Sequence, residues 1–176
     1  MSQVAIPVSH RAPGYRFEWA QDSIAGAKPQ NEDRLGLRLP EPELLRHKGI
    51  TALVADGVSQ STGGGEAAAL AVQGFLADYY ATPETWTVKT SAYRVLAALN
   101  RWLHGMNQRS PSGEAGLLCT LSVLIVTSGE AHIFDGRIGR DPDCPWKAVV
   151  DGELITCDHD CRSAPGDTCD DVDDTD

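Results

Sequence analysis

Residues 50–69 read ITALVADGVSQSTGGGEAAA, and this stretch joins a short apolar run to a glycine-rich turn and the start of an amphipathic helix. The run from Ile50 to Ala55 is brief and β-branched at several positions, which favours a buried strand over a helix. Asp56 follows where that strand leaves the core. Gly57 has no Cβ, so the backbone there can turn sharply and a carbonyl oxygen can come close to a ligand.

A carboxylate beside an exposed carbonyl at a strand end suits Mg²⁺ or Mn²⁺, which prefer oxygen ligands. Asp-Gly is also a common signal of an ordinary strand-to-loop turn, and the two residues alone leave that alternative open. A second acidic motif, Asn31-Glu32-Asp33, precedes residues 34–38, where apolar and charged residues alternate as in a half-exposed strand. Two such strands would place Asp33 and Asp56 over the same cavity.

The NED motif, followed by ITALVADGVSQSTGGGEAA, resembles the metal-dependent serine/threonine protein phosphatases of the type 2C or PPM-type family, and most of all their bacterial branch. AHIFDGRIGR, residues 131–140, is similar to the Asp-Ser-Arg strand motif of that family. The resemblance spans roughly residues 14–140. It implies an α+β fold, here a partial α-β-β-α sandwich in which antiparallel sheets are flanked by helices.

The resemblance also implies a two-metal site that holds Mn²⁺ or Mg²⁺. Asp33, Asp56 and Gly57 match metal-ligand positions, the adjacent Glu32 is a further candidate metal ligand, and Asp135 matches the ligand of a third metal. Asp33 and Asp56 would carry the catalysis, because two ions bridged by Asp56 lower the pKa of a shared water for attack on phosphorus. The implied reaction is hydrolysis of phosphoserine or phosphothreonine, with a phosphoprotein as the substrate.

Two positions depart from the family pattern. The family has a phosphate-binding arginine five residues before the NED aspartate, where this chain has Lys28. A lysine keeps the charge but loses the bidentate fork, and a solvated loop lysine is the alternative. About three residues are missing before Asp135, and an odd deletion reverses which face the later residues of a strand occupy.

Beyond Arg140 the resemblance decays, and the later aspartate motifs that complete the two-metal site have no convincing copy. We therefore divide the chain into residues 1–140, the N-terminal part of the phosphatase domain, residues 141–160, a degraded continuation, and residues 161–176, an acidic disordered tail. Too few carboxylates remain for two cations. The alternative to an active phosphatase is thus a truncated, impaired family member that retains one ion, or a noncatalytic module that binds cations or a protein.

Composition limits the partners. The formal net charge is −10, and most of the excess acid lies in residues 157–176, which argues against nucleic acid as a partner. No apolar run approaches the roughly 20 residues that span a bilayer, and no signal peptide is evident, so we expect no membrane contact and a cytoplasmic location. The segment CDHDC, residues 157–161, lacks the CxxC pairing of zinc ribbons, which favours unpaired thiols over zinc. The sequence does not specify an oligomeric state.

Apolar periodicity predicts the remaining elements. One helix is expected over residues 66–81, and a second one, capped at Thr82, is expected to run to Gln108 with Trp86 and Trp102 at the edge of its packed face. An apolar run over residues 116–127 and a partner strand over residues 131–134 are separated by Ser128-Gly129-Glu130, which predicts a β-hairpin.

Overall fold

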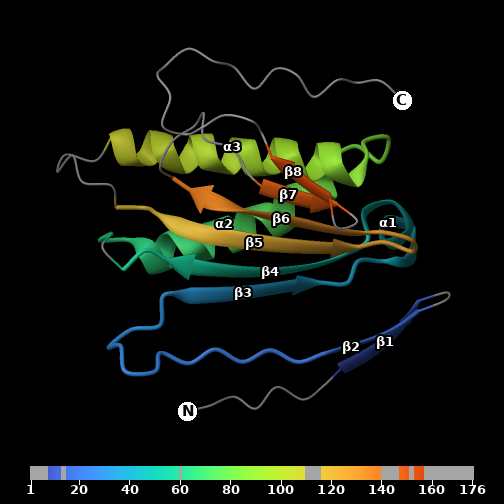
Figure 1. Ribbon diagram of the computed structural model, residues 1–176, viewed down its shortest axis with the longest axis horizontal. Helices are drawn as coiled ribbons and strands as arrows, with labels where there is room; N and C mark the ends of the chain where they lie inside the picture. The colour runs from blue at the N-terminus through green and yellow to red at the C-terminus, as the bar shows by residue number, and fades with distance from the viewer. Residues whose placement is uncertain are drawn as a thin grey trace.

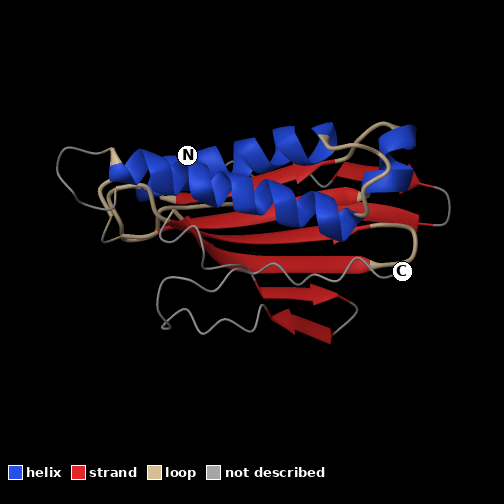
Figure 2. Cartoon of the chain, turned by 90° about the horizontal axis from the view of Figure 1, so that it is seen from above, coloured by secondary structure: helices blue, strands red, loops and turns tan. Residues whose placement is uncertain are grey.

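The computed structural model describes residues 8–12, 15–59, 61–109, 116–139, 147–150 and 153–156. A six-stranded antiparallel sheet, in the order β3-β4-β5-β6-β7-β8, forms one layer, and helices lie along one of its faces (Figures 1 and 2). The elements in chain order are β1 (Val8–Ala12), β2 (Tyr15–Trp19), β3 (Asp33–Arg38), α1 (Pro42–Lys48), β4 (Ile50–Gly57), α2 (Gly64–Ala81), α3 (Val88–Gln108), β5 (Cys119–Val126), β6 (Ala131–Ile138), β7 (Lys147–Val150) and β8 (Glu153–Thr156).

The sheet alternates between a covered and an open face because successive side chains of a strand point to opposite sides. In β4, Leu53 and Ala55 are buried, whereas Val54 between them is 54% exposed. Leu124 of β5 and Ile133 of β6 are also exposed on the side away from the helices. The hydrophobic core therefore lies between the covered face and the helices.

Helix α2 packs on β3, β4 and β5, and α3 packs on α2 and β6. The helix expected over residues 66–81 is confirmed as α2, in which Ala67, Ala71, Phe75 and Tyr79 form a fully buried stripe. Trp102 of α3 is 48% exposed, as expected for a residue at the edge of the packed face rather than in its centre. None of the helices in the described part of the chain is both long and apolar enough to span a lipid bilayer.

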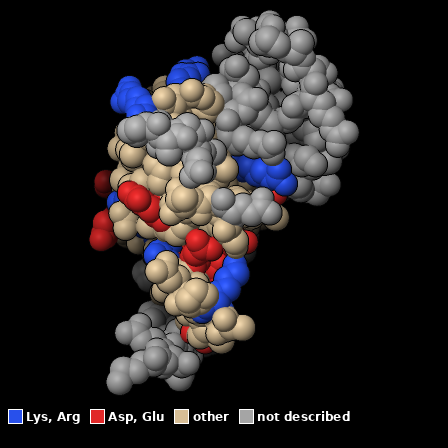
Figure 3. All heavy atoms as spheres, turned by 90° about the vertical axis from the view of Figure 1, so that its left-hand side faces the viewer, with Lys and Arg blue, Asp and Glu red and all other residues tan. Residues whose placement is uncertain are grey.

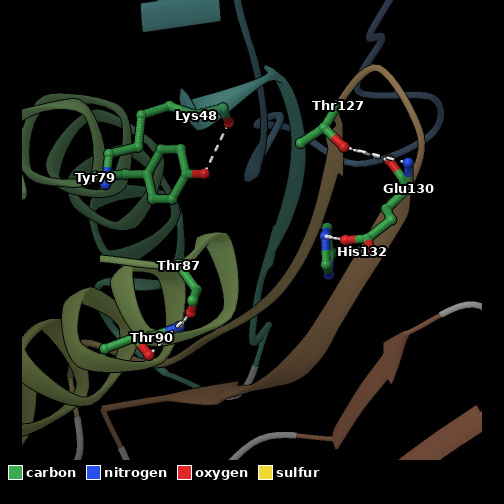
Figure 4. A network of polar contacts seen from close by, with 7 residues as sticks. All are labelled: Lys48, Tyr79, Thr87, Thr90, Thr127, Glu130 and His132. Atoms are coloured by element: carbon green, nitrogen blue, oxygen red, sulfur yellow. Dashed lines mark hydrogen bonds and ion pairs between the residues drawn. The ribbon is translucent and has the colours of Figure 1, made fainter. Parts of the chain in front are cut away.

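The start of α3 differs from the prediction. Its N-cap is Thr87, whose Oγ1 accepts a hydrogen bond from the Thr90 backbone N–H at 3.1 Å (Figure 4). Thr82 instead ends α2, and Pro83 begins a turn that the Trp86 N–H closes at 3.1 Å. Both threonines satisfy the local N-cap pattern, and packing of the connection decides between them.

A buried lysine joins the three helices. Lys48, the last residue of α1, is fully buried, and its Nζ donates to Thr82 Oγ1, to the Pro83 carbonyl and to Ser91 Oγ at 2.7–2.8 Å. The Tyr79 hydroxyl donates to the Lys48 carbonyl at 2.8 Å (Figure 4). Burial lowers the pKa of Lys48, and the nearby carboxylate of Glu84 partly opposes that effect. The ammonium group therefore serves the structure of the helical layer.

The predicted fold class is confirmed: this is an α+β chain whose antiparallel sheet is flanked by helices. In the described residues the second sheet is the two-stranded β1-β2 ribbon. Strands β7 and β8 continue the six-stranded sheet past residue 140. The boundaries expected at residues 140 and 160 stay predictions, and the expected acidic tail lies outside the described residues.

Candidate functional site

Asp33 and Asp56 lie directly opposite each other on neighbouring strands. Asp33 begins β3 and pairs with Asp56 near the end of β4. The Gly57 N–H donates to the Glu32 carbonyl at 3.3 Å, which makes Gly57 and Glu32 a hydrogen-bonded pair. Pairs alternate along an antiparallel ladder, so Asp33 and Asp56 form the adjacent non-hydrogen-bonded pair, in which Cα atoms lie about 4.5 Å apart and side chains are closest. The two carboxylates therefore share one face at one end of the sheet.

A compact turn fixes the start of β3. The Asn31 side-chain oxygen accepts a hydrogen bond from the Asp33 backbone N–H at 3.0 Å. Arg34 Nη1 donates to the carbonyls of Asn31 at 3.0 Å and Asp33 at 2.7 Å. These contacts use only backbone atoms of Asp33, so its carboxylate stays available. The side chains of Asn31 and Arg34 thus hold the backbone on both sides of Asp33 and fix its orientation.

Gly57 brings β4 against the start of α2. A Cβ at this position would lie 2.6 Å from the Gly64 carbonyl oxygen and 2.8 Å from the Gly65 nitrogen. The missing Cβ thus permits close approach of two backbones, as the sequence predicts, although the neighbour seen here is the helix. Gly65 in turn lies beside Glu32. The acidic turn, the end of β4 and the N-terminus of α2 therefore meet at one place.

The acidic groups at this end form no ion pair within the described part of the chain. Within the described ranges, no Lys, Arg or His forms an ion pair with the carboxylate of Glu32, Asp33 or Asp56. Like charges directly opposite each other on two strands repel, and a bound cation would remove that cost. The described side chains form no cluster of three or more His, Cys, Asp or Glu gathered tightly enough for a metal ion. The facing carboxylates of Asp33 and Asp56 are the oxygen ligands that this end of the sheet could offer to a cation.

Lys28 lies near the same end of the sheet. Its Nζ donates to Ser59 Oγ at 2.9 Å, and Ser59 belongs to the loop that follows β4. The side chain is exposed, and its own loop is closed by a hydrogen bond from the Lys28 N–H to the Ala25 carbonyl at 3.1 Å. The structure thus brings the loop before β3 to the loop after β4 through this lysine.

Asp135 stands apart from the other predicted site residues. It occupies the middle of β6, opposite Ser122, whose hydroxyl donates to its carboxylate at 2.5 Å. Relative to Asp56 it lies two strands across and two residues along, which separates the Cα atoms by about 12 Å. The sheet therefore brings Asp33, Asp56, Gly57, Glu32 and Lys28 to one end and leaves Asp135 outside that group.

Arg137 is a site residue that sequence reasoning did not single out. The row that contains Asp33 and Asp56 continues through Thr120 of β5 to Arg137 of β6. Two signals were available: Arg137 is the arginine of the segment similar to the Asp-Ser-Arg motif, and β6 alternates so that Ala131, Ile133, Asp135 and Arg137 share the exposed side. That pattern indicates a face but does not identify the residues opposite.

The thiol nearest this end is not a nucleophile. Cys119 begins β5 opposite Gly57 and is fully buried. Burial, with a smaller contribution from the Asp56 charge, raises the pKa of the Cys119 thiol to about 12. A thiolate is the reactive form, so Cys119 is inert at neutral pH.

Figure 3 shows the end of the molecule at which β4 finishes and β5 begins. Acidic and basic groups lie side by side on the part of this surface that the view shows. This mixture of charge is suited to a ligand that itself combines a cation with an anion.

Two solved structures are similar to this chain. PppA, described as a key regulatory component of T6SS in Pseudomonas aeruginosa, matches with a TM-score of 0.48 and 18% identity over 76% of this chain and 49% of that chain. A serine/threonine phosphatase from S. agalactiae matches with a TM-score of 0.47 and 13% identity over 77% of this chain and 48% of that chain. The chain thus spans about half the length of either structure. No protein-family model matches the sequence, and no curated protein does so.

Proposed function

We propose that this chain carries the metal-binding half-site of a PPM-type protein serine/threonine phosphatase, and that it hydrolyses phosphoserine or phosphothreonine by a metal-activated water. The observation that carries the proposal is the direct pairing of Asp33 with Asp56 at one sheet end. Two strands of a sheet hold these carboxylates rigidly, and the Asn31 turn leaves that of Asp33 free. The NED and VADGV motifs of the sequence agree with this geometry.

In this proposal Asp33 and Asp56 hold the cation, and the Gly57 carbonyl is the third oxygen that the strand end offers. Glu32, next to the pair, adds negative charge and would bind through water. When bound, Mn²⁺ or Mg²⁺ lowers the pKa of a coordinated water and polarises the phosphoryl group. Lys28, whose Nζ donates to Ser59 Oγ in the loop after β4, would neutralise phosphate charge. A protein nucleophile is unnecessary.

Asp135 does not enter this first ion site, because its Cα lies about 12 Å from that of Asp56. We keep it as a candidate ligand for a further cation on the open face of the sheet. The phosphoprotein substrate and the cytoplasmic location stay predictions from the sequence.

The second candidate is a protein that binds one divalent cation and turns over slowly or not at all. It is favoured by the ligand count, since the described residues bring two carboxylates face to face and no third one. A bridged hydroxide between two metals requires more acidic ligands than this pair provides.

The test measures Mn²⁺ binding by calorimetry and hydrolysis of a phosphothreonine peptide in millimolar Mn²⁺. We expect the wild type to bind Mn²⁺ and Asp56→Asn to lose this binding. The turnover of the wild type should lie below about 1 s⁻¹, the low end of ordinary enzymes. Asp22→Asn, an exposed loop carboxylate, is the matched control and should behave as the wild type. Equal Mn²⁺ binding by the wild type and Asp56→Asn would refute the metal site. Binding without any turnover would select the second candidate.

A further inference from the structure

Four polar side chains form one row across the open face of the sheet. Asp33 pairs with Asp56, Asp56 with Thr120, and Thr120 with Arg137, on strands β3, β4, β5 and β6. Directly opposed residues of antiparallel strands point to the same face. Arg137 is exposed, while Ile138 beside it is buried on the helix side. The row therefore has two carboxylates at one end and a guanidinium at the other.

The ladder also sets the spacing of this row. The Val58 N–H donates to the Leu118 carbonyl at 3.0 Å, so Asp56 and Thr120, two residues further along the ladder, are again a hydrogen-bonded pair. Thr120 and Arg137 then form a non-hydrogen-bonded pair, because the backbone groups of β5 alternate between its two neighbours. The Cα atoms of Asp56 and Arg137 are thus about 10 Å apart. Only the short side chain of Thr120 stands between them, which leaves room for a small ligand.

Arg137 differs from the two arginines of β3, Arg34 near this end and Arg38 at the opposite end of the strand. Arg34 donates to two backbone carbonyls, and Arg38 donates to the Leu76 carbonyl and stacks on the Tyr80 ring at 4.4 Å. In the described part of the chain, the Arg137 guanidinium forms no hydrogen bond or ion pair. The backbone next to Arg137, in contrast, is held by hydrogen bonds with α3. The amide nitrogen of nearby Gly139 donates to Asn100 Oδ1 at 2.9 Å.

A second contact from α3 holds the same strand end. Asn107 Nδ2 donates to the carbonyls of Gly139 and Leu117 at 2.9 and 3.0 Å, and its Oδ1 accepts from the Leu117 N–H at 2.8 Å. The helix therefore fixes the end of β6 against the start of β5. A fixed backbone with a free guanidinium is the arrangement expected of a ligand-binding arginine rather than a structural one.

We propose that Arg137 orients the phosphate group of the substrate, by binding two of its oxygens while the cation held by Asp33 and Asp56 binds another. This inference rests on the proposed function. A guanidinium presents paired N–H donors that match phosphate oxygens, and such charge-assisted bonds are the stronger kind. A tetrahedral phosphate fills the space over Thr120, whose hydroxyl is a further donor from the middle of the row. Arg137 thereby supplies the bidentate hydrogen bonding to phosphate that the single ammonium group of Lys28 cannot give.

An alternative role for Arg137 is to offset the charge of the two aspartates. Removal of a counter-charge would tighten Mn²⁺ binding and would leave phosphate affinity in the loaded protein unchanged. The two roles therefore differ in which ligand responds to a substitution.

The test measures the affinity of inorganic phosphate by calorimetry, with and without saturating Mn²⁺, for the wild type, Arg137→Gln and Arg137→Lys. We expect Arg137→Gln to weaken phosphate binding at least about tenfold, the equivalent of one charge-assisted hydrogen bond. Arg137→Lys should lie between the two, and neither variant should lose Mn²⁺ affinity. Arg101→Gln, an exposed arginine on α3, is the control and should match the wild type. Unchanged urea midpoints would show that all variants fold.

Phosphate affinity in Mn²⁺-loaded Arg137→Gln within twofold of the wild type would overturn the inference, as would a wild type that binds Mn²⁺ but no phosphate. Failure of the wild type to bind Mn²⁺ would instead contradict the proposed function. The metal-free titration then decides the role of Arg137 by itself. Phosphate binding that is tenfold weaker in Arg137→Gln than in the wild type would support that role. Equal phosphate affinity in the two proteins, or no phosphate binding by the wild type, would overturn it.

Discussion

Neutralising Asp33 should stabilise the metal-free protein and remove its response to Mn²⁺. The substitution Asp33→Asn keeps the shape of the side chain, and the hydrogen bonds at this position involve only backbone atoms. Asp33 faces Asp56 in a non-hydrogen-bonded pair, so their Cβ atoms lie about 5 Å apart, and we take this value as the separation of the two charges. The variant therefore removes one charge of a like-charged pair and little else.

Coulomb's law sets the size of the effect. Two unit charges at about 5 Å repel by about 0.8 kcal/mol in bulk water and by about 3 kcal/mol at an effective dielectric constant of 20. Asp56 is exposed and Asp33 is half-buried, which places the gain in unfolding free energy near the lower limit, at about 1 kcal/mol. Added salt should reduce this gain in unfolding free energy, because it screens the repulsion between the two carboxylates.

The assay is urea unfolding in EDTA at low salt, repeated at high salt and with Mn²⁺. Mn²⁺ at a hundred times its Kd would add about 2.7 kcal/mol to the wild type. The order of stability should thus reverse, with the variant more stable without metal and the wild type more stable with it. Asp22→Asn serves as the control. A metal-free Asp33→Asn protein that is less stable than the wild type, or that gains equally from Mn²⁺, would refute the reasoning.

Three further changes test other parts of the structure. Lys48→Met should lower the unfolding free energy by about 2 kcal/mol, since Ser91 and the Pro83 carbonyl lose a charged donor; a urea midpoint equal to that of the wild type would contradict this. Gly57→Ala should cost about 1–3 kcal/mol because its Cβ would meet the backbone of α2, and an unchanged thermal midpoint would exclude that contact. The Cys119 thiol has a pKa of about 12 in the folded protein, above its ordinary 9.0, so the folded state holds its proton longer than the unfolded chain. The contribution of this thiol to stability is complete below pH 9 and falls by about 1.4 kcal/mol by pH 10. Cys119→Ala, measured in EDTA, should therefore lose less unfolding free energy between pH 9 and pH 10 than the wild type. The same loss in both proteins would disprove the pKa shift.

Local pattern in the sequence was sufficient for most elements of the fold. The alternation in β3, the apolar runs of β4 and β5, and the helical stripe of α2 each depend on a period that neighbouring residues repeat. The same is true of the acidic ends of β3 and β4, since Asp33 and Asp56 each adjoin a recognisable strand. These features follow from chain-local chemistry and therefore appear in the residues themselves.

Only the tertiary structure decided which residues face each other. A period of two assigns a side chain to a face but not to a partner, because register is set by pairing between distant strands. Register places Asp33 opposite Asp56, extends that row to Arg137, and leaves Asp135 beside Ser122 instead. The choice of Thr87 over Thr82 as the cap of α3 has the same origin, since both fit the local pattern and the packing of the α2–α3 connection selects one. The candidate site therefore takes its residue types from the sequence and its geometry from the sheet.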